Sequence, residues 1–174
     1  MKENKIINVV FWGIFIFYLI LMVMILFIRV GMDSSNINLI PLKSIRECIN
    51  VYDGIRHRLI DDQVWGNVLI FIPAGLYIMI FSEKSAVPKT LLLTFSLSLG
   101  IEIIQYIFKV GASDIDDIIL NCLGGIIGVL VYLLLEKIFK TKEKIKKSIA
   151  IISLCVGVPV LALLLVLFCV NYLK

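Results

Sequence analysis

Five apolar runs, each about as long as a membrane-spanning helix, dominate this sequence. They cover residues 6–28, 64–82, 89–108, 115–139 and 148–172. A helix rises about 1.5 Å per residue and the hydrocarbon core of a bilayer is about 30 Å thick, so a span needs about 20 apolar residues. Hydrophobic residues make up 60% of the chain, against roughly 45–50% in soluble domains. The sequence therefore predicts an all-α integral membrane protein, with five transmembrane helices in a single domain over residues 1–174.

The first run resembles a cleaved signal peptide in position, but two features favour a retained helix. It is longer than the apolar core of a signal peptide. Large residues such as Met24, Leu26 and Phe27 occupy its end, where cleavage would require small ones. We therefore expect it to be the first transmembrane helix.

Cysteine and histidine usage argues against several kinds of site. The four cysteines show no CxxC spacing and three of them lie inside apolar runs, so neither a zinc site nor a disulfide framework is indicated. His57 is the only histidine, which rules out an HExxH motif. The net charge of +4 comes mostly from the short loop 140–147, which membrane topology explains better than nucleic-acid binding. We expect no cofactor, no metal and no nucleic-acid partner.

The loop over residues 29–63 contains a shorter amphipathic pattern. Its apolar residues recur at helical spacing after Pro41, a residue suited to the first position of a helix. They are Leu42, Ile45, Ile49 and Tyr52. The segment is too short to span, so it predicts a helix lying on the membrane surface, with a solvated connector as the alternative. The basic residues expected to contact lipid headgroups here are Arg46, Arg56 and Arg58.

Acids and amides interrupt the third and fourth runs. At about 100° per residue, polar side chains of the third run share one helical face. They are Thr94, Ser98, Glu102 and Gln105. In the fourth run, Asp117 and Asn121 share a face with Gly124 and Gly128, a small-xxx-small pair that lets another helix approach closely. In the second run, Pro73 should bend the helix, and Gly75 follows it.

The start of the fourth run carries a helix-capping pattern. Ser113 followed by Asp116 has the spacing of a capping box, with Asp in the position that Glu or Gln usually occupies. This gives Asp116 a sufficient structural role.

The distribution of lysine and arginine predicts the orientation. The short basic loop 140–147 should be cytoplasmic, and counting back places the N-terminus there too, in agreement with Lys2 and Lys5. The loop 29–63, the turn at residues 110–113 and the C-terminus should then be extracellular.

With this topology, six polar residues from three spans lie in or beside the outer half of the membrane. They are Asn67, Glu102, Gln105, Asp114, Asp117 and Asn121. A charged side chain near the bilayer centre costs roughly 2.5–3.5 kcal/mol, so intramembrane acids are by default a functional hypothesis. The alternative is that these groups hydrogen-bond one another and hold the bundle together, at about 0.6 kcal/mol per contact. Carboxylates fit this alternative poorly because they repel unless one is protonated or a cation is shared. We therefore favour a functional pocket.

Four segments together resemble the VanZ-like family of membrane proteins. They are NLIP (38–41), GNVLIFIPAG (66–75), EIIQYI (102–107) and DIDDIILNCLGGIIG (114–128). The resemblance implies that the family residues here are Asn38, Pro41, Asn67, Pro73, Gly75, Glu102, Gln105, Asp117, Asn121, Gly124 and Gly128. Many members carry an arginine in the turn before the acidic helix, where this chain has Gly111 and Ala112. Whether that arginine pairs with an acid or binds a phosphate, its role is either lost here or passes to Lys109.

The resemblance implies a bacterial cell-envelope protein, because the family is named for a protein that confers low-level resistance to teicoplanin, a lipid-bearing glycopeptide. We expect a non-enzymatic module that binds a lipid-linked cell-wall precursor, a lipoglycopeptide or a partner protein at an outward-facing polar groove among membrane lipids. One alternative is an enzyme acting on a lipid-linked substrate, with Glu102 and Asp117 as acid and base or as oxygen ligands of a divalent cation. The sequence shows no Ser/His or Cys/His nucleophile pair, which weighs against it. Another is a small proton-coupled transporter, for which five helices are few unless a homo-oligomer supplies more.

Overall fold

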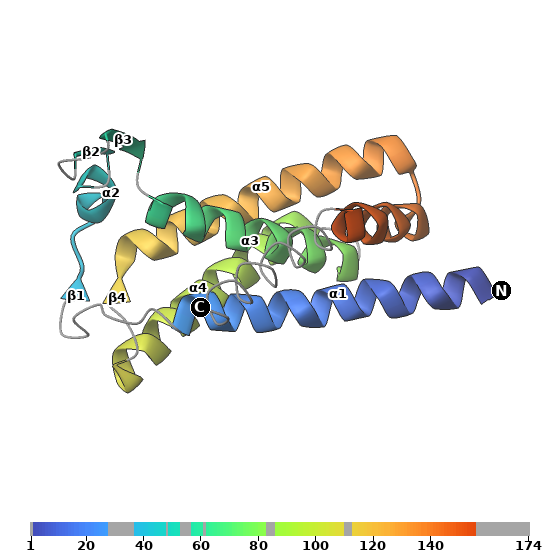
Figure 1. Ribbon diagram of the computed structural model, residues 1–174, viewed down its shortest axis with the longest axis horizontal. Coiled ribbons are helices and arrows are strands. Elements are labelled where there is room, and N and C mark those ends of the chain that lie inside the picture. Colours follow the sequence, from blue (N-terminus) through green and yellow to red (C-terminus); the bar gives the residue numbers. More distant parts are fainter. Residues whose placement is uncertain are drawn as a thin grey trace, which may run out of the picture. The chain divides into compact units, whose positions relative to one another are not determined.

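Within the part of the chain that the structure describes, four helices are long and apolar enough to cross a membrane. The computed structural model describes residues 2–27, 37–47, 49–52, 57–60, 62–82, 86–109 and 113–155. The four helices are α1 (Lys2–Phe27), α3 (Asp62–Phe81), α4 (Ala86–Phe108) and α5 (Ile115–Phe139) (Figure 1). Their ends agree with the first four predicted spans to within four residues.

A further helix covers residues 142–155. It begins before the fifth predicted span, 148–172, and the part of that span from residue 156 onward lies outside the described residues. The count of five spans and the orientation of the termini stay predictions.

The chain divides into two compact units. The larger one, Ile20–Leu134, holds α3, α4 and most of α5, and with them all the candidate site residues that lie on these helices. The smaller one combines Met1–Leu19 with the chain from Leu135 onward, and so contains the first part of α1 and the helix 142–155.

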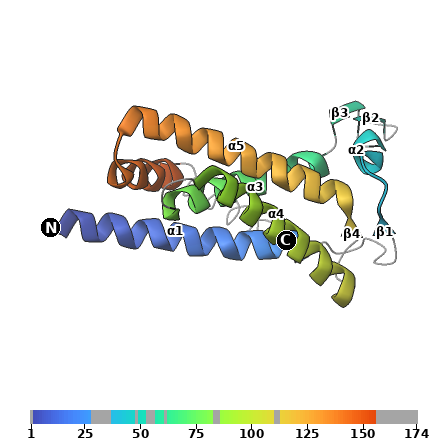
Figure 2. The ribbon, with the colours of Figure 1, turned by 180° about the vertical axis from the view of Figure 1, so that it is seen from behind.

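Helix α5 lies against α3 through a row of glycines (Figure 2). A Cβ atom added to Gly124 would collide with the carbonyl oxygen of Val68, and one added to Gly128 would collide with the carbonyl oxygen of Ile72. The two backbones approach so closely here that no side chain fits between them, which is the geometry that small residues permit in membrane helices.

Two more glycines complete this three-helix contact. A Cβ atom on Gly75 of α3 would meet the backbone of Gly125, and one on Gly125 would meet the side chain of Thr94 on α4. Gly125 therefore lies where α5 touches both of its neighbours. Helix α3 itself continues through Pro73 to Phe81, and the bend expected at the proline stays a prediction.

Two small sheets lie at the end of the bundle where α3 and α5 begin and α4 ends (Figure 1). In the first, β1 (Ile37–Asn38) runs parallel to β4 (Ser113–Asp114), with Asn38 opposite Asp114. In the second, β2 (Ile49–Tyr52) and β3 (His57–Ile60) pair antiparallel. The first sheet joins the loop before α3 to the turn before α5.

The surface helix predicted from Leu42 to Tyr52 is wrong in its extent. Helix α2 covers only Lys43–Glu47, and Ile49–Tyr52 form the strand β2. The physical reason is that isoleucine, valine and tyrosine favour strands, and the antiparallel partner β3 satisfies their backbone groups. The position of this segment on a membrane surface stays a prediction.

Candidate functional site

The polar face of α4 is buried along the length of the helix. Its members are at most 5% exposed, and they are Thr90, Thr94, Ser98, Glu102 and Gln105. Apolar residues elsewhere on the same helix are open, with Leu92 65% and Ile107 63% exposed. Helix α4 therefore directs polar groups into the protein and leaves apolar side chains for lipid, and Thr90 extends the stripe that the sequence suggests by one turn.

Hydrogen bonds from buried amides connect the three helices. The Asn121 Nδ2 atom on α5 donates to the Ser98 Oγ atom on α4 at 2.9 Å. The Asn67 Nδ2 atom on α3 donates to the Asp117 Oδ1 atom on α5. Each bond joins two different helices, so residues from three spans meet in one buried cluster. Gln105 is also buried and lies one turn beyond Glu102 on α4.

Glu102 binds the turn that precedes α5. Its Oε2 atom accepts the backbone N–H of Asp114 at 2.9 Å. The carboxyl group is only 5% exposed. A buried acid must have hydrogen-bond partners, and the Asp114 N–H from β4 is one of them.

Asp114 caps α5, which corrects the predicted capping box of Ser113 and Asp116. The Asp114 Oδ1 atom accepts the backbone N–H of Asp116 at 2.9 Å, the bond of an N-cap residue with the second residue of its helix. The reason is that α5 begins at Ile115, so the cap lies one residue later than the sequence pattern suggests.

Asp116 is thereby available to bind the segment around α2. Its two carboxylate oxygens accept the backbone N–H groups of Leu42, at 2.5 Å, and of Ile45, at 3.1 Å. Its side chain is 1% exposed. This arrangement satisfies two backbone donors at the start of α2, where a short helix has no partners of its own.

A second set of bonds fixes the same segment to Asp114. The Asn38 Nδ2 atom donates to Asp114 Oδ1 at 2.9 Å and lies 2.8 Å from Ser44 Oγ. The Ser44 hydroxyl donates to Asp114 Oδ2. The sequence gives no local signal for Ser44 or for this role of Asp116, and only the NLIP resemblance points to Asn38.

The basic residues expected to meet headgroups are dispersed. Arg46 is exposed on α2, and Lys109 is exposed at the end of α4 with a left-handed φ of 52°. Arg58 lies in β3 opposite Val51. Arg56 lies outside the described residues.

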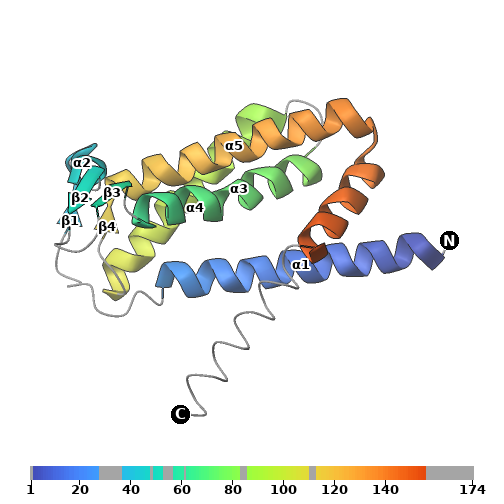
Figure 3. The same ribbon diagram turned by 45° about the horizontal axis from the view of Figure 1, so that its top comes forward.

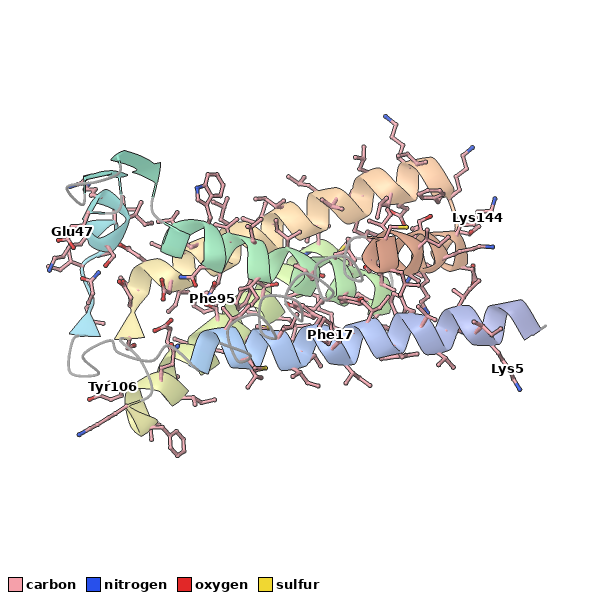
Figure 4. The ribbon with its side chains drawn as sticks, viewed as in Figure 1. Lys5, Phe17, Glu47, Phe95, Tyr106 and Lys144 are labelled. Atoms are coloured by element: carbon pink, nitrogen blue, oxygen red, sulfur yellow. The ribbon has the colours of Figure 1, made fainter. Side chains whose placement is uncertain are left out.

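A groove of about 400 Å³ lies beside the buried cluster. Its apolar and aromatic lining comes from α4, α5 and the residue after β1, and consists of Leu39, Leu99, Ile103, Tyr106, Ile115 and Ile118. Glu102, Ser113 and Asp114 supply its polar groups. Tyr106 marks the last turns of α4, near β1 and β4 (Figure 4). Among the described residues that line the groove, none is basic, so it combines an apolar wall with acidic acceptors.

The described residues were also compared with the requirements of a metal centre. Within the ranges that the structure describes, no three His, Cys, Asp or Glu side chains are placed to hold one ion together.

Comparison with known proteins identifies the family. Residues 15–136, which include the buried cluster and the groove, match the profile of the VanZ/LLP1 family. The chain belongs to this family. Protein VanZ of Enterococcus faecium is 42% identical over 101 residues, which cover 58% of this chain and 59% of that protein. The chain thus spans about three fifths of the length of this curated relative, and no solved structure matches it.

Proposed function

We propose that this VanZ/LLP1 family member helps the bacterial cell envelope to resist teicoplanin-type antibiotics by binding a lipid-bearing ligand in the groove between α4 and α5. The observation that carries the proposal is the apolar wall of the groove beside the carboxyl group of Glu102. A lipid tail would lie along Leu99 and Ile103, and the polar head would reach Glu102 and Asp114.

The ligand would enter sideways from the bilayer. Three residues of the α4 wall are open at the helix surface, with Leu99, Ile103 and Tyr106 all exposed. Lipid tails are as apolar as this wall, so burying a tail here gains little free energy. Selectivity among lipid-bearing ligands must then come from the polar head, while the tail brings the ligand into the bilayer.

The charge of the groove favours a head with hydrogen-bond donors over a phosphate. At about 4 Å and an effective dielectric constant of about 20, two like charges repel by about 4 kcal/mol. A phosphate beside Asp114 would meet this repulsion, and the described lining offers no cation to offset it. A glycopeptide carries hydroxyl and N–H donors and avoids the penalty, so we favour a lipoglycopeptide over a lipid-linked phosphate precursor.

The proposed side of the membrane is the outer one. The distribution of lysine and arginine predicts that the start of α3, the end of α4 and the start of α5 lie outside. These three helix ends do lie together, next to β1 and β4 (Figure 1). The groove would then open to the outer leaflet, where a lipid-bearing antibiotic arrives.

The test is a drug-susceptibility profile in a sensitive Gram-positive host. Ile103→Trp fills the groove without touching the acids, and Leu92→Trp makes the same kind of change on the lipid-facing surface of α4 away from the groove. Glu102→Gln keeps an acceptor for the Asp114 N–H but removes the charge. We expect Ile103→Trp and Glu102→Gln to lose protection against teicoplanin, and Leu92→Trp to keep it.

Vancomycin, which lacks the lipid tail, is the matched control drug. We expect the protein and each variant to leave the susceptibility of the host to vancomycin unchanged. Membrane abundance of each variant is measured by immunoblot, so that a loss of protein is not read as a loss of binding. Protection that survives Ile103→Trp at equal abundance would show that the groove does not hold the drug.

A further inference from the structure

A second cavity, of about 280 Å³, lies in the smaller unit between the start of α1 and the helix 142–155. We call it the lysine pocket, and it is lined by Ile7, Asn8, Glu143, Lys144, Lys146 and Lys147. Figure 3 shows the helix 142–155 leaving the end of α5 and reaching α1. The groove proposed above shares no residue with this pocket.

The lysine pocket is strongly positive. Its described lining carries three lysines and one glutamate, and Lys5 lies on α1 three residues before Asn8. Figure 4 shows Lys5 and Lys144 at the same end of this unit. The lysines occupy the first turns of the helix 142–155, where the partial charge of the helix dipole is also positive. The helix therefore begins in an arrangement that a bound anion would stabilise.

The pocket lies where two candidate membrane spans end, which is where lipid headgroups are expected. The apolar span of α1 begins at Lys5 and that of α5 ends at Phe139, immediately before the basic segment. Beside the pocket, Ile6 and Val9 are 65% and 72% exposed on α1. A phospholipid can thus place its phosphate between the lysines and its tails along the apolar surface of α1.

One of the three lysines is held in place. The Lys146 Nζ atom lies 5.6 Å from the centroid of the Phe11 ring, within the range of a cation–π contact. Phe11 is 0% exposed, and Ile145 and Ile149 on the helix 142–155 are also buried. Because less side-chain freedom is lost on binding, a pocket that is formed in advance binds more tightly than loose surface lysines do.

We propose that the lysine pocket is a binding site for the headgroup of an anionic phospholipid, such as phosphatidylglycerol. This inference does not depend on the proposed function, because it concerns other residues and another ligand. Each lysine near an anionic membrane surface contributes about a fivefold gain in lipid affinity. Removing two lysines of the pocket should therefore weaken the preference for the anionic lipid about 25-fold.

The protein carries its own reporter. It has two tryptophans, and Trp12 lies one turn after Asn8 on α1, so Trp65→Phe leaves a single fluorophore beside the pocket. The Trp65→Phe protein is reconstituted in bilayers that contain both phosphatidylcholine and phosphatidylglycerol. In one sample the phosphatidylglycerol carries the bromine quencher, and in the other the phosphatidylcholine carries it. We expect brominated phosphatidylglycerol to quench Trp12 more strongly than brominated phosphatidylcholine at equal content.

Two pairs of exposed lysines give the matched comparison. Lys144→Gln with Lys147→Gln removes two charges from the pocket and leaves the Lys146–Phe11 contact intact. Lys140→Gln with Lys142→Gln removes two charges from the same basic segment outside the pocket. We expect the first pair to weaken the preference about 25-fold and the second to weaken it much less, because its lysines lie outside the pocket. Equal loss in both pairs would indicate general surface attraction and overturn the proposal, and so would displacement of the lipid by inorganic phosphate.

Discussion

Replacing Gly128 with alanine should force α3 and α5 apart. A Cβ atom at this position would overlap the carbonyl oxygen of Ile72 and lie 2.8 Å from the Leu76 nitrogen and 3.1 Å from the Gly75 Cα atom. All of these are backbone atoms, so no side-chain rotation can relieve the overlap. The contact with Leu76 alone must lengthen by 0.6 Å, from 2.8 Å to the ordinary 3.4 Å.

The expected loss of stability follows from this overlap. Inserting a group into a close-packed contact costs typically about 1–3 kcal/mol. Alanine also gains up to about 1 kcal/mol over glycine in helix propensity. Gly100 on α4 provides the control, because a Cβ atom there would meet nothing within 4 Å. The propensity gain is common to both positions, so Gly128→Ala should be less stable than Gly100→Ala by about 1–3 kcal/mol.

The assay is equilibrium unfolding in mixed micelles, driven by increasing dodecyl sulfate and followed by far-UV circular dichroism. The free energies of unfolding of Gly128→Ala, Gly100→Ala and the parent protein are compared under one condition. Equal stability of the two variants would refute the close approach of α3 and α5 at this crossing.

Two further substitutions test the hydrogen bonds of the cluster. Asp116→Ala removes the acceptor of the Leu42 and Ile45 N–H groups. Tryptic cleavage at the basic residues of α2 should therefore become at least about tenfold faster. The cleavage rate of Asp116→Asn should lie between those of Asp116→Ala and the parent protein. Unchanged cleavage would argue against this attachment. Asn67→Leu removes the amide that donates to Asp117 and should lower the free energy of unfolding by about 1–3 kcal/mol, with the conservative Asn67→Gln as the comparison in the same dodecyl sulfate titration.

The spans could be predicted from the sequence because a bilayer imposes a simple rule. A helix must offer about 20 apolar residues, and any polar face must turn away from lipid. This rule locates α4 and gives the face that carries Ser98 and Glu102, both of which are buried. It requires no knowledge of how the helices are paired.

The contacts outside the spans could not be predicted, because they depend on distant segments. The pairing of Asn38 with Asp114 joins positions 76 residues apart, and no local pattern encodes it. In the loop, the spacing of Ile49 and Tyr52 fits a helix but their residue types favour a strand, and the partner strand β3 decides between them. The position of the α5 cap differs by one residue from the predicted one, and this difference releases Asp116 for another partner.

The hydrogen bond between Asn38 and Asp114 joins the two ends of the segment that contains α2, α3 and α4. Glu102 on α4 binds the backbone of Asp114, while the side chains of Asp114 and Asp116 bind the segment around α2. A change in the groove that draws Glu102 away from β4 would therefore loosen the cap of α5 and the segment around α2 together. The same few hydrogen bonds thus couple the groove between α4 and α5 to the segment around α2.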